Sequence, residues 1–111
     1  MVDITKGFIN CGTEEVYWEI AAMFCKDGRK RMKHLQDGVK KNDMEVFSLE
    51  THSLKSVAAT IGDYDLAKVA SDANSRCKLN DLSVIQEEGQ KVIDLYQATI
   101  EELEDKIRQH A

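Results

Sequence analysis

The chain of 111 residues contains no proline. Average usage of about 5% would place about five prolines in a chain of this length. Because proline breaks helix interiors and is common in loops, its absence favours long helices joined by short connections. The aromatic content of 6% and the scarcity of alternating β-branched residues argue against a sheet.

Apolar residues recur at three- and four-residue spacing along most of the chain, which predicts a series of amphipathic helices. The predicted helices cover residues 3–11, 13–41, 43–62, 63–79 and 80–107. Favourable N-cap residues begin the four longer segments, at Thr13, Asp43, Asp63 and either Asn80 or Asp81. Within the second segment Gly28 marks either a bend or a break, and the sequence does not decide between them.

Four substantial helices with short turns predict an all-α fold, an antiparallel up-and-down four-helix bundle with the short N-terminal helix as a lid. The chain has a mass of 12.6 kDa and shows no internal repeat, low-complexity stretch or linker. A single domain over residues 1–111 is therefore expected. No signal peptide is recognisable, and no apolar run approaches the roughly 20 residues that a membrane helix needs.

Charge and cysteine content exclude several classes of function. The net charge of -5 argues against a nucleic-acid binder, which usually carries an excess of basic residues. The three cysteines are far apart and form no C-x-x-C pair, so a zinc site or disulfide framework is not expected, and a reducing cytoplasm is the natural compartment. No histidine pair or H-E-x-x-H motif suggests a metal site.

The third predicted helix carries a histidine on its polar face. Its apolar residues fall within an arc of about 100°, at Phe47, Leu54, Val57, Ala58 and Ile61. His52 lies roughly 170° from the middle of that arc and is expected to face water. Its helical neighbours are small, apart from one lysine, and comprise Ser48, Lys55, Ser56 and Ala59. A histidine with mainly small side chains around it is accessible to a large partner.

The sequence from His52 to Gly62 reads HSLKSVAATIG, and it resembles the signature of histidine phosphotransfer (Hpt) domains. That signature is His-x-Leu-Lys-Gly/Ser, a stretch of small residues, then an apolar residue and glycine. The lead-in over residues 9–24 and the Asn42-Asp43 pair are similar to the family as well, so the resemblance covers about residues 3–103. Ser56 replaces the glycine of many members, but serine is also small.

The resemblance implies a phosphorelay intermediate in which His52 accepts a phosphoryl group, through Nε2, from a receiver-domain aspartate and passes it to another receiver. The implied partners are response-regulator receiver domains and a hybrid sensor histidine kinase, and a monomer is expected. The receiver would supply the aspartate and Mg²⁺, and this chain would bind no cofactor. Lys55 is expected to give electrostatic support that tunes the reaction, since an exposed pair contributes at most about 1 kcal/mol.

The remaining candidate site residues are identified by their positions on the same predicted helix. Leu49 lies about 60° from His52 and is either a boundary residue or a docking contact. Together with the small residues Ser48, Ser56 and Ala59 it forms the expected partner-binding surface. Gly62 is expected to have a backbone or close-packing role. The two other histidines, His34 in a basic run and His110 in a tail expected to fray, are expected to be inert.

Other classes of function are weighed against the phosphocarrier. A pseudo-Hpt adaptor would bind receivers without being phosphorylated, but it would need neither His52 nor Lys55. A metal-carboxylate oxidase built in the bundle interior would need inward Glu-x-x-His sets, which this sequence lacks. No glycine-rich nucleotide loop is present, so autokinase activity is not expected.

Overall fold

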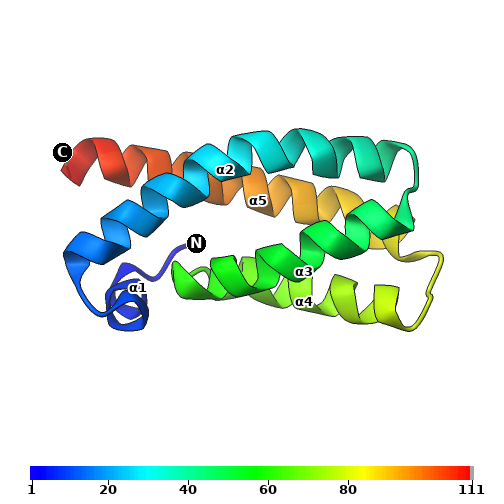
Figure 1. Ribbon diagram of the computed structural model, residues 1–111, viewed down its shortest axis with the longest axis horizontal. Helices are drawn as coiled ribbons and strands as arrows, with labels where there is room; N and C mark the ends of the chain where they lie inside the picture. Colours follow the sequence, from blue (N-terminus) through cyan, green and yellow to red (C-terminus); the bar gives the residue numbers. More distant parts are fainter. Residues whose placement is uncertain (111) are drawn as a thin grey trace.

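The computed structural model describes residues 1–110, which form five helices and no strand. The helices are α1 (Ile4–Cys11), α2 (Glu14–Lys40), α3 (Met44–Thr60), α4 (Tyr64–Lys78) and α5 (Val84–His110). The four long helices reverse direction from one to the next, with α2 lying along α5 and α3 along α4 (Figure 1). The predicted all-α class is confirmed. No helix among these residues combines the length and the apolar character needed to span a bilayer.

The starts of the first four helices are set by side-chain caps. Each cap accepts a hydrogen bond from the backbone N–H three residues later, and the caps are Asp3, Thr13, Asp43 and Asp63. The predicted caps at Thr13, Asp43 and Asp63 are confirmed. The last helix begins later than predicted, at Val84, because Asp81 instead accepts from the N–H of Ser83 and shapes the preceding loop.

Helix α2 is continuous through Gly28, which settles whether the chain bends or breaks there. The glycine backbone packs directly against α5. A Cβ at this position would lie 2.7 Å from Cδ1 of Ile100 and 3.3 Å from Cε1 of Tyr96. The absent side chain therefore lets the two longest helices approach closely, and this packing outweighs the low helix propensity of glycine.

The short helix α1 and the residues before it cover the end of α3 (Figure 1). The N–H of Asp3 donates to the carbonyl of Gly62 at 2.8 Å, and the hydroxyl of the fully buried Tyr17 donates to the carbonyl of Ile61 at 2.8 Å. These bonds satisfy carbonyls at the end of the helix that would otherwise lack partners. The segment before α1 and the start of α2 therefore both bond to the end of α3, the helix that carries His52.

The loop between α4 and α5 is held by one arginine. Arg76 Nε donates to Asp81 at 2.7 Å, and its other nitrogens reach Ser83 and Glu87. The hydroxyl of Ser83 donates to the same Asp81 carboxylate at 2.6 Å. This network joins the last turn of α4 to the first turn of α5.

Replacing Asp81 with asparagine is expected to cause a loss of stability that depends on pH. The hydrogen bond from Arg76, with those from Ser83, lowers the pKa of Asp81 from 3.8 to about 2. Because the folded-state pKa is the lower one, the carboxylate stabilises the fold fully above about pH 4 and progressively less as the pH falls towards 2. In urea unfolding, the difference between wild type and Asp81→Asn should therefore narrow over this range. A difference that stays constant with pH would contradict the expectation.

Candidate functional site

His52 lies on the exposed face of α3 near the middle of the helix. The opposite face is buried and contributes Phe47, Glu50, Thr51, Leu54 and Ala58 to the interior. The exposure predicted for His52 is therefore confirmed. The apolar arc was wrong at one position, since Val57 is 45% exposed. Val57 lines a groove between α2 and α3 that the helical wheel of α3 alone does not reveal.

The other predicted site residues lie around His52 with different exposure. Leu49 is 56% exposed and Ser56 is exposed, whereas Ser48, Lys55 and Ala59 are partly buried. Ser48 and Leu49 lie with His52 along one shallow depression, and Lys55, Ser56 and Ala59 do not line it. The predicted site residues therefore do not form one surface feature: some line the depression, and the others lie on the following turns of α3.

The depression lies between α3 and α4 and contains residues that reasoning from the sequence missed. Its lining is Glu45, Ser48, Leu49 and His52 from α3, with Asn74 and Lys78 from α4. A signal was available, because Asn74 interrupts the apolar stripe of α4 and Lys78 follows it one turn later on the same face. Which residues of α3 they approach depends on the register between the helices, which the sequence does not specify.

Asn74 fixes α4 against the turn of α3 that precedes His52. It is 1% exposed, and its Nδ2 donates to the carbonyl of Ser48 at 2.9 Å and to Oγ1 of Thr51 at 3.2 Å. Within residues 1–110, its Oδ1 is buried without a hydrogen-bond partner. These contacts hold the wall of the depression in a defined register, which pre-positions the groups beside the imidazole.

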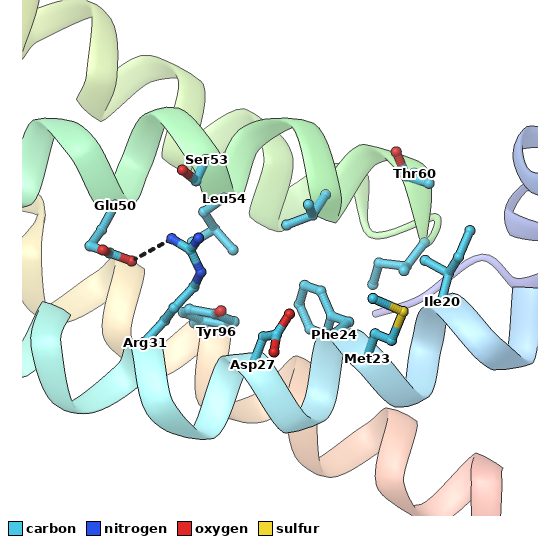
Figure 2. A pocket seen from close by; sticks show the side chains of 12 residues that line it. Ile20, Met23, Phe24, Asp27, Arg31, Glu50, Ser53, Leu54, Thr60 and Tyr96 are labelled. Atoms are coloured by element: carbon cyan, nitrogen blue, oxygen red, sulfur yellow. Dashed lines mark hydrogen bonds and ion pairs between the residues drawn. The ribbon is translucent and has the colours of Figure 1, made fainter.

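A second hollow, of about 240 Å³, lies between α2 and α3 and is mainly apolar (Figure 2). Ile20, Met23 and Phe24 line it from α2, and Leu54 and Val57 line it from α3. At one end Arg31 reaches from α2 to the buried carboxylate of Glu50 on α3 at 3.2 Å (Figure 2). The same end contains Tyr96, and burial raises the pKa of its hydroxyl to about 12.

The two histidines expected to be inert surface residues both make specific contacts. His34 Nδ1 lies 2.9 Å from Glu50 Oε2, so this imidazole shares the buried carboxylate with Arg31. His110 lies in the last turn of α5, and its ring stacks on Trp18 with centroids 4.4 Å apart. Both contacts are tertiary: His34 joins the consecutive helices α2 and α3, and His110 joins α5 to the start of α2.

The geometry around His52 suits transfer of a group to an external partner. The imidazole is exposed to solvent and carries ring nitrogens that can act as nucleophiles, and the depression beside it contains one lysine, Lys78. No group of three or more His, Cys, Asp or Glu side chains that could hold a metal ion occurs in the described chain.

Comparison with known protein families identifies the Hpt domain. The model of the Hpt domain matches residues 19–110, from the second turn of α2 to the end of α5, so that α1 and the start of α2 precede it. No match was found among curated proteins or among solved structures. The match covers well over half of the chain and includes the whole of α3 with His52. Hpt domains are helical phosphotransfer modules of two-component signalling that interact with receiver domains and kinases. The chain belongs to the Hpt domain family.

Proposed function

We propose that this chain is a phosphocarrier in a two-component phosphorelay and carries the phosphoryl group on His52 between receiver-domain aspartates. The observation that supports this most directly is the open, central position of His52 on α3 in a chain of the Hpt family. A neutral imidazole has a ring nitrogen with a free lone pair, and an exposed one can therefore act as a nucleophile towards a docked partner.

The proposed reaction has two mirror-image steps. The Nε2 lone pair of His52 attacks the phosphorus of a receiver's aspartyl phosphate. The N–P bond forms while the O–P bond breaks, which leaves the aspartate carboxylate behind and the Nδ1 proton on the ring. A second receiver then reverses the step, because its carboxylate attacks the phosphorus and the neutral imidazole leaves. In-line positioning and charge neutralisation are the main requirements of such a transfer.

The receiver would supply the aspartate and Mg²⁺, and this chain would bind no cofactor. Docking is assigned to the surface around His52, with Leu49 as its exposed apolar contact and Ser48, Ser56 and Ala59 as small residues that allow close approach. A hybrid sensor histidine kinase is the proposed source of phosphoryl groups. The chain is proposed to act in the cytoplasm as a monomeric module without autokinase activity.

Replacing Lys55 with alanine is expected to slow phosphoryl transfer no more than about fivefold. Lys55 is only partly buried, and an exposed ion pair with a phosphoryl group contributes at most about 1 kcal/mol. Single-turnover transfer from a phosphorylated receiver, followed by intact mass, gives the rate. Lys55→Arg, which keeps the charge, should restore most of it. Complete loss of transfer in Lys55→Ala would show that the lysine is essential and not a tuning group.

The test of the proposed function is phosphoryl acceptance from a panel of phosphorylated receiver domains with Mg²⁺. The expected product is an acid-labile, base-stable adduct that maps to His52. ATP alone should give no adduct. If the folded chain binds a receiver but accepts no phosphoryl group from any of them, the phosphocarrier proposal fails. The alternative, a pseudo-Hpt adaptor that binds receivers without being phosphorylated, would then be favoured.

A further inference from the structure

We propose that the hollow between α2 and α3 is a binding site for a small organic cation, namely a primary amine with an apolar body. The apolar body would lie among the aliphatic and aromatic side chains of the hollow, and the ammonium would bind to Asp27 and to the hydroxyl of Tyr96 (Figure 2). This inference goes beyond the proposed function and does not depend on it. The hollow shares no lining residue with the depression that contains His52.

The hollow has the size and the lining of a site for a small ligand. Its volume of about 240 Å³ equals that of roughly eight water molecules in the liquid, which suits a molecule of about eight to ten non-hydrogen atoms. Met23 and Val57 border this space and are 62% and 45% exposed, so an apolar ligand would remove both side chains from water. The other apolar lining residues are Ile20, Phe24, Leu54 and Ile61.

Tyr96 contributes a buried polar group without a partner. The residue is 3% exposed, and its hydroxyl forms no hydrogen bond within residues 1–110. The unpartnered polar side-chain atoms that are fully enclosed belong to Trp18 and Asn74, so the Tyr96 hydroxyl is open to the hollow that it lines (Figure 2). A buried tyrosine hydroxyl usually has a hydrogen-bond partner, and a polar group of a ligand would supply one here.

The charges around the Tyr96 hydroxyl favour a cation. Three charged side chains line the hollow, and they are Asp27, Arg31 and Glu50. Arg31 and Glu50 pair at 3.2 Å, whereas Asp27 forms no ion pair within the described residues. After burial, the charges of these three groups are among the causes that set the pKa of the Tyr96 hydroxyl, so all three lie near it. The unpaired Asp27 carboxylate, together with the aromatic rings of Phe24 and Tyr96, therefore favours an ammonium group.

The test is an NMR titration of the full chain at pH 7 with 2-phenylethylamine, whose amine is protonated at this pH as that of lysine is. Two ligands of similar size, 2-phenylethanol and 3-phenylpropionate, present a neutral hydroxyl and a carboxylate in place of the ammonium. Shifts of the backbone amides of Phe24 and Leu54 report binding from both walls of the hollow. Asp27→Asn and Tyr96→Phe are compared with Asp37→Asn, which removes a negative charge from α2 outside the hollow.

The expected result is saturable binding of 2-phenylethylamine with a Kd of about 0.1–1 mM and clearly weaker binding of the alcohol and the carboxylate. Asp27→Asn should weaken binding of the amine about three- to fivefold, and Tyr96→Phe about two- to tenfold. Asp37→Asn should leave the Kd near the wild-type value.

Three results would each overturn the proposal. The first is that the amine does not shift the amides that line the hollow. The second is that the alcohol or the carboxylate binds as tightly as the amine, which would make the hollow a general apolar groove or a site for an anion at Arg31. The third is that neither Asp27→Asn nor Tyr96→Phe weakens binding more than Asp37→Asn does.

Discussion

Replacing His52 with glutamine is expected to abolish phosphoryl acceptance from every receiver while leaving the fold intact. The amide nitrogen of glutamine has its lone pair delocalised into the carbonyl and cannot attack phosphorus as imidazole does. The side chain is exposed on α3, so the substitution should change the free energy of unfolding by no more than about 0.5 kcal/mol. The substitution is thus expected to remove phosphoryl acceptance with almost no change in stability.

The measurement compares the adduct formed by wild type and His52→Gln under the same receiver and Mg²⁺, with urea unfolding of both proteins. His34→Gln is the matched control, because His34 is also a half-exposed imidazole but is held by Glu50 on the other side of α3. It should accept phosphoryl groups normally. An adduct that persists in His52→Gln, or that disappears in His34→Gln, would show that His52 is not the acceptor.

The sequence is sufficient for the features that depend on local chemistry. The side-chain caps at Thr13, Asp43 and Asp63 act within one turn, and the exposure of His52 follows from the 3.6-residue period of a single helix. These features need no knowledge of how the helices are arranged. The resemblance of the segment after His52 to the Hpt signature then supplied the family, which the match over residues 19–110 bears out.

What the sequence did not reveal depends on which helices meet and at what register. Val57 lies on the apolar side of α3 but is exposed, because α2 and α3 leave a hollow between them. His34 and Glu50 are polar residues on separate helices whose pairing depends on the α2–α3 contact. Lys78 lines the same depression as His52 only because α4 packs along α3, where Asn74 is hydrogen-bonded to α3. Each case requires a tertiary distance that no single-helix period provides.

Replacing Gly62 with alanine is expected to destabilise the fold by about 2–4 kcal/mol. The residue has φ of +93°, a left-handed conformation that costs a residue with a Cβ roughly 1–2 kcal/mol. In addition, a Cβ at this position would lie 2.2 Å from the carbonyl oxygen of Asp3. The segment before α1 would have to move, and the hydrogen bond from Asp3 N–H to the Gly62 carbonyl would be lost or weakened.

Gly12 is the control that separates the cost of the backbone conformation from the cost of the close contact. It has nearly the same φ, +91°, but nothing lies within 4 Å of the point that its Cβ would occupy. Gly12→Ala should therefore cost only the conformational part, about 1–2 kcal/mol, in urea unfolding. The excess cost in Gly62→Ala would measure the close contact between the lid and the end of α3. If the two variants lose equal stability, the contact with Asp3 relaxes freely and the lid does not fix the end of α3. A larger loss in Gly62→Ala, with phosphoryl acceptance retained on His52, would show that this glycine supports the helix and takes no part in the chemistry.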